Sequence, residues 1–295
     1  MLKKNPRFPG AGLIVLLLVA WGSTACQSSS SPDPDPDPDP YDYTELVRQF
    51  NYDGAAALDI QETAVTDVGA GSLHDLSYRS PRGGRVPAFL LIPNGSGPFP
   101  GVVFLHWGVS GGNKNEFLPD AMELAGLGIA SLSIDAPFVR PEWDGLRGDP
   151  LYIQTVIDLR RAADLLLARS DIDPQRLGFC GHSFGATWGG VLAGVDRRFR
   201  SFVLMAGHSQ IGLCSTCGEP ASQRLWAVYY IGHAAPAALL FQFATQDAWI
   251  SRAAAENYYE TASNPKSIIW YDTDHGFNTQ AMIDRINWLR AQFGL

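Results

Sequence analysis

Short apolar runs recur along the chain from residue 73 onward, and longer segments with helical spacing separate them. Several of the runs are continuous in Val, Ile, Leu and Phe, which is typical of interior strands of a sheet covered on both faces. The pattern predicts eight strands, namely Leu73–Ser80, Arg85–Ile92, Gly101–His106, Ile129–Ile134, Leu177–Gly181, Ser201–Met205, Ala237–Ala244 and Ser267–Tyr271.

The segments between these runs predict helices, because their apolar residues recur every three or four positions. Tyr152, Val156, Leu159 and Ala163 share one helix face in this way, and charged residues occupy the other faces. The predicted helices are Glu116–Leu127, Asp149–Ala168, Phe184–Gly194, Ala221–Gly232, Ser251–Ala262 and Asn278–Phe293.

The order of these elements predicts the fold class. Only Arg82-Gly83-Gly84 separates the first two strands, which is typical of an antiparallel hairpin. Strands and helices alternate afterwards, which implies parallel neighbours joined by right-handed crossovers. We therefore expect an α/β fold with a mostly parallel eight-stranded sheet and helices on both faces.

Residues 1–25 have the pattern of a secretory signal peptide. Three basic residues precede an apolar run at 13–20, and small residues then lead to Cys26. An apolar run of about ten residues is too short to span a bilayer core, which needs about 20. We therefore expect this segment to be cleaved and the protein to be exported.

The residues around the expected cleavage site suggest a lipid anchor. Ser23-Thr24-Ala25-Cys26 resembles a bacterial lipoprotein cleavage box, which implies that Cys26 becomes the lipidated N-terminus of the mature chain. Gln27 replaces the Asp that favours inner-membrane retention, so the resemblance implies an outer-membrane anchor in the cell envelope. Because Ser23 stands where a Leu is usual, a secreted or periplasmic protein with a stray cysteine is the alternative.

Residues 26–40 continue with a serine run and a Pro-Asp alternation. Proline removes a backbone donor and restricts φ, so this composition predicts a stiff, charged linker. The remaining residues, 41–295, suit one large α/β domain better than two small ones. The formal net charge of −8 becomes −11 once the three positive residues of the signal are lost, so nucleic acid is not an expected partner.

Cys214 and Cys217 form a Cys-x-x-Cys pair. In an exported protein such a pair is expected to oxidise to a local disulfide. Free thiols and a metal or redox site are the alternatives, although a zinc site would need a second ligand pair and only His208 lies close by.

Ser183 lies in Gly181-His182-Ser183-Phe184-Gly185, between a predicted strand and a predicted helix. A serine at such a sharp turn projects its hydroxyl above the sheet edge, and a Cβ on either glycine would collide with the neighbouring strand or helix. The helix that follows points free backbone N–H groups at negative charge that develops on a substrate. The motif therefore predicts a nucleophile.

Three further segments accompany this motif: Pro100–Gly108, Asp171–Gly178 and Asp274–Phe277. Together they make the chain from residue 73 onward resemble the α/β-hydrolase superfamily, and within it the dienelactone-hydrolase and prolyl-oligopeptidase-like branch. The resemblance implies the α/β-hydrolase fold, with a small cap insertion at 206–236. Dienelactone hydrolases proper carry a cysteine nucleophile, so Ser183 argues against that particular reaction.

The superfamily places its catalytic residues in the chain order Ser, acid, His. A serine hydroxyl needs a neighbouring base, and that base works best when a carboxylate fixes its tautomer. His275, in a loop after the last predicted strand, is the expected base. Asp247, at the carboxyl end of the preceding strand, is the expected acid, and Asp272 and Asp274 are its rivals.

The other histidines near the motif are expected to have other roles. His208 and His233 follow Ser183, but the acids between Ser183 and these histidines do not come just after a core strand. His182 adjoins Ser183, yet consecutive residues at a tight turn point in different directions. We therefore expect His182 to be a packed structural histidine.

Two backbone N–H groups would stabilise the tetrahedral oxyanion. The first is expected from Phe184, the residue after the nucleophile. The second is expected from the family-like His106-Trp107-Gly108 segment, where Trp107 is preferred and Gly108 is the alternative.

These features predict a serine hydrolase that cleaves small carboxylic esters through an acyl-enzyme, with no metal or cofactor. A peptidase or a lactone or polyester hydrolase with the same triad is the alternative enzyme. A non-catalytic binding lipoprotein is the alternative from another class. The residues Arg140, Glu142, Trp143 and Arg147 would either line a substrate pocket or form a solvated loop.

Overall fold

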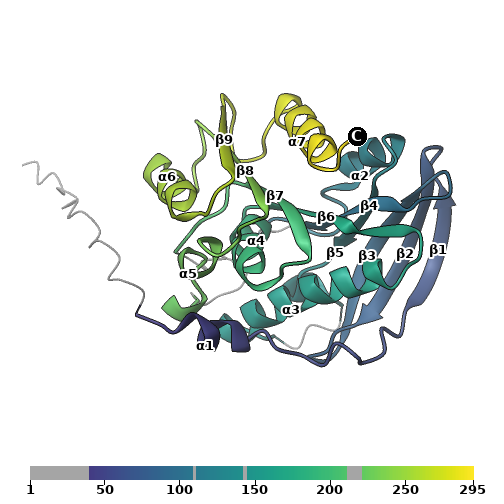
Figure 1. The fold of residues 1–295 in the computed structure, drawn as a ribbon, viewed down its shortest axis with the longest axis horizontal. Helices are drawn as coiled ribbons and strands as arrows, with labels where there is room; N and C mark the ends of the chain where they lie inside the picture. The colour runs from purple at the N-terminus through teal and green to yellow at the C-terminus, as the bar shows by residue number, and fades with distance from the viewer. Residues whose placement is uncertain (1–39, 109–110, 142–144, 211–220) are drawn as a thin grey trace, which may run out of the picture. The chain divides into compact units, whose positions relative to one another are not determined.

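Nine strands of the described residues form one sheet, in the order β1-β2-β3-β5-β4-β6-β7-β8-β9 (Figure 1). The computed structural model describes residues 40–108, 111–141, 145–210 and 221–295. The strands are β1 (Gln61–Asp67), β2 (Gly71–Arg79), β3 (Arg85–Pro93), β4 (Phe99–Leu105), β5 (Ala130–Ile134), β6 (Ile172–His182), β7 (Phe199–Met205), β8 (Ala238–Ala244) and β9 (Lys266–Tyr271).

The strand directions agree with the alternation in the sequence. β2 and β3 form the predicted antiparallel hairpin, in which Arg79 lies opposite Arg85. β1 pairs with β2, and β3 with β5, in antiparallel orientation. The six strands in the order β5-β4-β6-β7-β8-β9 are parallel to one another. The mostly parallel sheet is therefore confirmed.

The predicted number of strands was wrong by one, because β1 was missed. All seven residues of β1 are exposed, and the strand lies at one edge of the sheet. An edge strand with no buried face needs no apolar alternation, so its sequence carries little of the pattern that reveals a strand. The other eight strands match the predicted runs.

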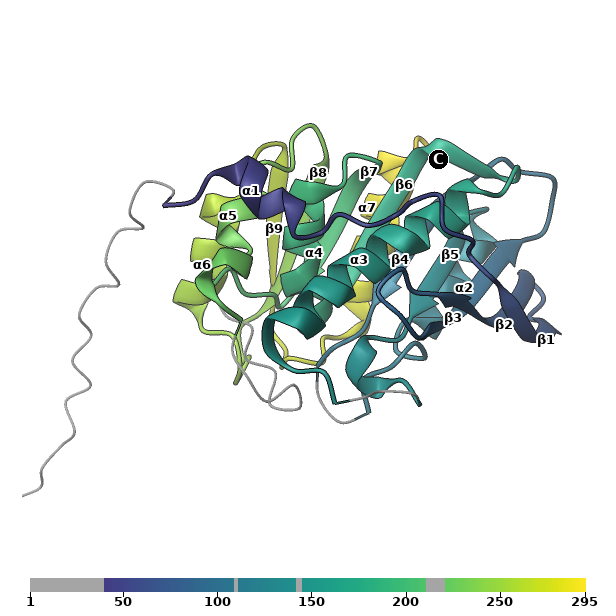
Figure 2. The same ribbon diagram turned by 90° about the horizontal axis from the view of Figure 1, so that it is seen from below.

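Helices cover both faces of the sheet (Figures 1 and 2). α2 and α7 pack on one face, where they also contact each other, and α3 and α4 pack on the other. The helical elements are α1 (Tyr43–Arg48), α2 (Leu118–Gly126), η1 (Pro137–Val139), α3 (Gly148–Leu167), α4 (Phe184–Val195), η2 (Gln223–Leu225), α5 (Val228–Ile231), α6 (Arg252–Thr261) and α7 (Thr279–Gln292).

One predicted helix is replaced by two short ones. The run 221–232 forms η2 and α5, because Trp226 between them has extended backbone angles, with φ −65° and ψ 132°. The Val228 amide then donates to Ser209 O at 2.9 Å instead of continuing the first helix. Residues 211–220 lie outside the described residues, so the cap insertion at 206–236 stays a prediction.

Strand β4 shows why the core has two halves. Its Val103 and Leu105 belong to the apolar cluster on the α3 and α4 side, and Val102 and Phe104 belong to the cluster on the α2 and α7 side. Side chains alternate between the two faces of a strand, and helices cover both faces here. Burying each such side chain stabilises the fold by about 1.5–3 kcal/mol. The β4 backbone is thereby held where the loop that follows it can contribute to a site.

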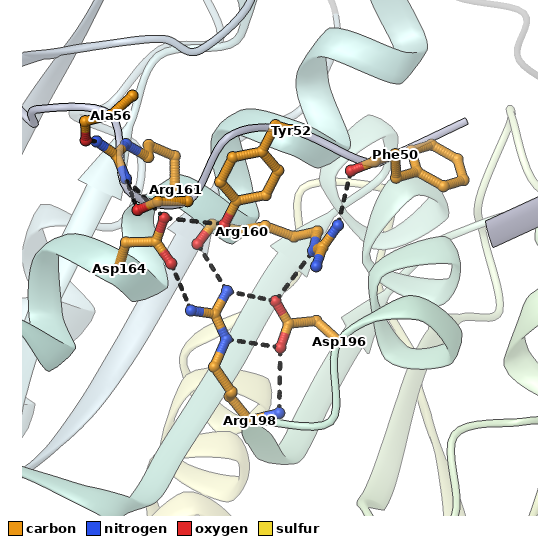
Figure 3. Close-up of polar contacts among 9 residues, drawn as sticks. Phe50, Tyr52, Ala56, Arg160, Arg161, Asp164, Asp196 and Arg198 are labelled. Atoms are coloured by element: carbon orange, nitrogen blue, oxygen red, sulfur yellow. Dashed lines mark hydrogen bonds and ion pairs between the residues drawn. The ribbon is translucent and has the colours of Figure 1, made fainter. Parts of the chain in front are cut away.

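The segment 40–58 runs along α3 (Figure 2), where a polar network fastens it. Arg160 donates to Phe50 O at 2.7 Å, and the Tyr52 hydroxyl donates to Asp164 Oδ2 at 2.9 Å. Arg198, the residue before β7, also binds the Asp164 carboxylate (Figure 3). The start of β7 therefore belongs to the same network. The N-terminal part of the domain is thus tied to the helical layer by charged groups as well as by packing.

Candidate active site

The three residues expected to form a triad all follow carboxyl ends of parallel strands. Ser183 comes directly after β6, Asp247 shortly after β8 and His275 shortly after β9. In open parallel sheets, ligands bind in the crevice outside this edge. The topology therefore brings these three loops to one end of the sheet.

Ser183 has the strained backbone of a sharp strand-to-helix turn. Its φ is 54° and its ψ is −104°, and the next residue begins α4. A non-glycine residue in this region of φ costs free energy and persists only where its surroundings enforce it. The Ser183 amide donates to Met205 O at 2.7 Å, which holds the turn against the end of β7.

The two glycines of the motif are required by close approaches of the backbone. A Cβ on Gly181 would lie 2.5 Å from the carbonyl carbon of Gly185 in α4. A Cβ on Gly185 would lie 2.0 Å from Leu105 O at the end of β4. The expected collisions with the neighbouring helix and strand are therefore present, and only glycine fits either position.

Asp247 and His275 form a direct hydrogen bond. The distance from His275 Nδ1 to Asp247 Oδ2 is 2.8 Å, and the Asp247 side chain is only 1% exposed. The other carboxylate oxygen, Oδ1, accepts from the amides of Trp249 and Ile250 at 2.8 and 3.0 Å. Burial acts to raise the pKa of Asp247, but the hydrogen bonds from His275, Ile250 and Trp249 outweigh burial and leave this pKa below its ordinary value.

The rival acids make other contacts. Asp272 Oδ1 accepts from the Gln246 side-chain amide at 2.8 Å. Asp274 Oδ1 accepts from the Gly276 amide at 3.0 Å, which closes a turn within the loop. Of the three carboxylates considered from the sequence, Asp247 is therefore the one that the described contacts join to His275.

The rival bases lie in other surroundings. The His208 ring accepts at Nδ1 from the Gln210 amide at 3.0 Å, and burial lowers the pKa of His208. The His233 ring stacks on Tyr43, with 3.7 Å between the ring centroids. These contacts indicate structural roles for both histidines.

His182 joins the Ser183 turn to the His275 loop. It is buried, with 1% exposure, as expected for a packed structural histidine. Its Nε2 lies 2.9 Å from the backbone oxygen of His275, and the two rings are 5.0 Å apart. The residue next to Ser183 is therefore in direct contact with the residue that Asp247 binds.

Glu116 is a site residue that the sequence did not reveal. Its Oε1 lies 2.6 Å from His182 Nδ1, and its Oε2 accepts from the Trp107 amide at 2.8 Å. The sequence pattern placed Glu116 at the start of a helix, whereas α2 begins at Leu118 and Glu116 lies in the preceding loop. No spacing or motif marks a loop carboxylate that makes contacts of this kind.

The contact with Glu116 changes the expectation for the oxyanion site. The Trp107 amide was the preferred second donor, but Glu116 already accepts its hydrogen bond. The preference for Trp107 is therefore corrected, because a donor engaged by a carboxylate is not aimed at a substrate. Phe184 is the first residue of α4, where backbone amides have no intrahelical acceptor.

Arg140 belongs to neither of the two environments considered for it. It is 8% exposed, and its guanidinium lies 2.7 Å from Asp158 Oδ2 and donates to Asp135 O at 2.9 Å. Burial raises the pKa of Asp158, and the nearby Arg140 opposes this rise. Arg140 is thus a buried structural cation. Glu142 and Trp143 lie outside the described residues.

Trp249 is a second residue that sequence reasoning missed. It is 67% exposed, and its ring centroid lies 6.5 Å from that of His275. Its amide donates to Asp247, so Trp249 lies next to both members of the Asp247–His275 pair.

The cysteines add little that the structure describes. Cys26, Cys214 and Cys217 lie outside the described residues, so lipidation and the disulfide stay predictions. Cys180 is a free, buried thiol, and burial raises the pKa of Cys180. No three metal-ligating side chains come together within the described residues. The same part of the chain holds no helix both long and apolar enough to cross a membrane.

No family model matches the sequence, and no curated protein is similar to it in sequence. Several solved structures are similar in fold. An acetyl xylan esterase from Paenibacillus sp. R4 has a TM-score of 0.67 and 18% identity, over 84% of this chain and 92% of that one. Acetyl xylan esterase 1 from Thermoanaerobacterium sp. JW/SL YS485 has a TM-score of 0.69 and 15% identity, over 87% and 95%.

A glucuronoyl esterase from Solibacter usitatus is also similar, with a TM-score of 0.63 and 12% identity, over 85% of this chain and 92% of that one. Identities of this size show a shared fold and no more. The predicted α/β-hydrolase fold is thereby confirmed.

Proposed function

We propose that this protein is a serine hydrolase that cleaves carboxylic esters, with Ser183 as nucleophile, His275 as base and Asp247 as the orienting acid. The observation that carries the proposal is the 2.8 Å hydrogen bond between His275 Nδ1 and Asp247 Oδ2. His182, the residue before Ser183, contacts the His275 backbone, and Ser183 itself has φ 54° at a strand-to-helix turn. A carboxylate on Nδ1 fixes the tautomer that leaves Nε2 free to accept a proton.

The reaction follows from these positions. Ser183 Oγ attacks the carbonyl carbon while His275 Nε2 takes its proton, and the carbonyl π electrons move to oxygen. The tetrahedral intermediate collapses to an acyl-enzyme, and the leaving alcohol takes the proton from His275. Water then attacks the acyl carbon in the same way, which releases the acid and restores the Ser183 hydroxyl.

The oxyanion is stabilised by backbone N–H groups in this proposal. Phe184 supplies one from the N-terminus of α4. The second comes from the loop after β4, in which the Trp107 amide donates to Glu116. Removing one such donor from an oxyanion hole typically costs about 3 kcal/mol of transition-state stabilisation.

Ester substrates with a ring in the alcohol part suit this site. The similar structures include esterases named for acetyl xylan and glucuronoyl substrates. Trp249 offers an exposed apolar face next to His275, the residue that returns the proton to the leaving alcohol. Membership of the dienelactone-hydrolase and prolyl-oligopeptidase-like branch remains part of the proposal, since it depends on the sequence motifs.

The experiment compares wild-type mature chain with Ser183→Ala on short-chain p-nitrophenyl esters, acetylated sugars, lactones and acyl amides. The proposal expects ester turnover by the wild type, loss of it by about 10⁴-fold or more in the variant, and labelling of Ser183 by a fluorophosphonate. Unchanged ester hydrolysis in Ser183→Ala would refute the assignment. Faster cleavage of amides than esters would favour the peptidase, and no labelling with no turnover would favour a binding lipoprotein.

We also propose that Cys26 carries a lipid that anchors the exported protein to the cell envelope. The support is the Ser23-Thr24-Ala25-Cys26 segment after a signal-like run and before the Pro-Asp linker. Expression of the full chain in bacteria with labelled palmitate should label the wild type but not Cys26→Ser. An unlabelled wild-type chain in the soluble fraction would contradict the anchor.

A further inference from the structure

Another carboxylate–histidine pair, Glu116 and His182, contacts the backbone of His275. Glu116 Oε1 and His182 Nδ1 are 2.6 Å apart, and the His182 side chain is only 2% exposed. The Glu116 side chain is 18% exposed. Nothing in the proposed chemical steps uses either residue, so the pair needs another explanation.

Both ring nitrogens of His182 face oxygen acceptors. Nδ1 faces the Glu116 carboxylate, and Nε2 lies 2.9 Å from the carbonyl oxygen of His275. A carbonyl oxygen can only accept, so Nε2 must carry a proton to bond to it. Glu116 also accepts the Trp107 amide at 2.8 Å. Glu116 and the His275 carbonyl therefore hold the His182 ring at both of its nitrogens.

The polar atoms of this pair are satisfied locally. A buried polar group is tolerated when it is hydrogen-bonded. The two carboxylate oxygens of Glu116 and the two ring nitrogens of His182 each have a hydrogen-bond partner. The pair therefore forms a complete polar unit without any group from the substrate.

The unit connects three of the four loops that carry the proposed chemistry. Glu116 binds the Trp107 amide in the loop after β4, and His182 ends β6 immediately before the nucleophile. His182 also binds the backbone of His275 in the loop after β9. These loops come from strands far apart in the sequence, so the sheet alone does not set the spacing of their side chains.

The His275 loop has particular need of such a contact. His275 lies between Asp274, whose side chain closes a turn, and Gly276, which has no side chain to pack. Asp247 holds the imidazole, and the contact from His182 holds the backbone of the same residue. Misplacing a reacting group by about 1 Å can lower a rate by about 100-fold.

We propose that Glu116 and His182 are positioning residues, in which a carboxylate and a histidine ring together hold the His275 backbone, the nucleophile turn and the loop after β4 in register for ester cleavage. This inference rests on the proposed function for its effect on turnover. Its structural part, the hydrogen bonds of the Glu116–His182 pair, does not depend on that function.

Substitutions of His182 can separate its two hydrogen bonds. His182→Gln keeps a donor near the position of Nε2, toward the His275 carbonyl, and loses the bond to Glu116. His182→Asn keeps a donor near the position of Nδ1, toward Glu116, and loses the bond to His275. His182→Ala loses both.

The proposal expects kcat to fall by about 10- to 100-fold in His182→Ala and His182→Asn, with KM within about threefold of the wild type. His182→Gln should recover most of the lost kcat, because it restores the contact with the His275 backbone. Wild-type kcat in His182→Ala, or equal losses in the Gln and Ala variants, would overturn the proposal.

Glu116→Gln tests the other half of the pair. An amide oxygen can accept from either His182 or the Trp107 amide, so at least one of the two bonds is lost or weakened. The proposal expects a fall in kcat of about 10-fold or more. It also expects the double variant Glu116→Gln, His182→Ala to be no slower than His182→Ala alone, because the two residues act as one unit. Fully multiplicative losses would contradict a shared role.

The hydrogen bond from His182 to the His275 backbone can be measured without any activity assay. In wild-type protein labelled with ¹⁵N-histidine, spectra should show a proton on Nε2 of His182 that is hydrogen-bonded to the His275 carbonyl, and His182→Gln identifies the signals. A His182 ring without a proton on Nε2 would overturn this contact. This measurement stands even if the wild type cleaves no ester, in which case the proposed function fails and the polar unit does not.

A matched control removes one buried hydrogen bond elsewhere. Tyr78 is fully buried, and its hydroxyl donates to Asp158 O at 3.0 Å. Tyr78→Phe should lower the midpoint of thermal unfolding and leave kcat at the wild-type value. A loss of kcat in this control as large as that in His182→Asn would show that general destabilisation explains both, and would also overturn the proposal.

Discussion

Asp247 holds His275 across two loops, with 2.8 Å between the carboxylate oxygen Oδ2 and the ring nitrogen Nδ1. The two residues are 28 positions apart in the chain, and the parallel pairing of β8 with β9 brings their loops together. The same carboxylate is held by the amides of Trp249 and Ile250, so its orientation is set before any substrate arrives. This relationship leads to the first two predictions.

Asp247→Asn should lower kcat for esters by about 10⁴-fold without unfolding the protein, because an amide no longer fixes the required tautomer of His275. Steady-state kinetics with a p-nitrophenyl ester measures the loss, and circular dichroism checks the fold. Asp272→Asn and Asp274→Asn are matched controls, expected within a few-fold of wild type. A larger loss of kcat in either control than in Asp247→Asn would show that the acid lies in the His275 loop and that Asp247 is not the acid.

Stability should fall in acid partly through Asp247. Hydrogen bonds from His275, Ile250 and Trp249 outweigh burial and leave the folded-state pKa of Asp247 below the ordinary value of about 3.9. Above that value the contribution to stability is complete. It is lost as pH falls toward the folded-state pKa, because the unfolded chain binds the proton first.

Urea unfolding between about pH 3 and pH 6 tests this expectation. Asp247→Asn should flatten the dependence of the unfolding free energy on pH by up to about one proton. Ser183→Ala changes no ionisable carboxyl group and should keep the wild-type slope. An Asp247→Asn slope equal to that of wild type would show that the carboxylate has the same pKa in both states.

Gly185→Ala should destabilise the protein by about 1–3 kcal/mol or more and abolish activity, since the new Cβ would lie 2.0 Å from Leu105 O. The loop after β4 and the nucleophile turn would have to separate. Gly126→Ala in α2 is the matched control, because a Cβ there meets nothing within 4 Å. It should be neutral or up to about 1 kcal/mol stabilising. Thermal unfolding measures the stability of both variants. A Gly185→Ala variant as stable as the wild type would disprove the close approach.

Arg140→Met should lower the free energy of unfolding by about 3–5 kcal/mol, because it leaves the buried Asp158 carboxylate without its cation. The double variant Arg140→Met, Asp158→Asn should recover part of that loss. Arg48→Ala breaks an exposed pair with Glu45 and should cost less than about 1 kcal/mol. Chemical denaturation measures all three. A loss of unfolding free energy in Arg140→Met as small as that in Arg48→Ala would show that Arg140 lies in a solvated loop, as the sequence allowed.

Trp249→Ala should raise KM for esters with a cyclic alcohol by about 10-fold and for ethyl esters by much less. The reason is that the exposed indole, 6.5 Å from the His275 ring, offers its face to the alcohol part. Stability should change by no more than about 0.5 kcal/mol, since the side chain is 67% exposed. Trp249→Phe should keep most of the preference. Equal changes in KM for both ester classes would show that Trp249 does not contact the alcohol part of the substrate.

Much of the fold could be predicted because its signals are local. The eight matched strands are buried apolar runs, and periodicity within a run depends on neighbouring residues only. β1 escaped because its seven residues are exposed and carry no such period. The run 221–232 was read as one helix, although the Val228 amide bonds to Ser209 instead, a contact that helical spacing does not predict.

The sequence alone determined the strand-turn-helix around Ser183, with glycines where a side chain would collide, and the chain order of Ser183, Asp247 and His275. These features depend on which residues are adjacent and on which strand each one follows. Only the tertiary structure decided that Glu116 binds both His182 and Trp107, that Arg140 is buried against Asp158, and that Trp249 stands exposed beside His275. Such contacts join segments far apart in the chain, and the crossovers and strand order of the folded sheet set the distances between them.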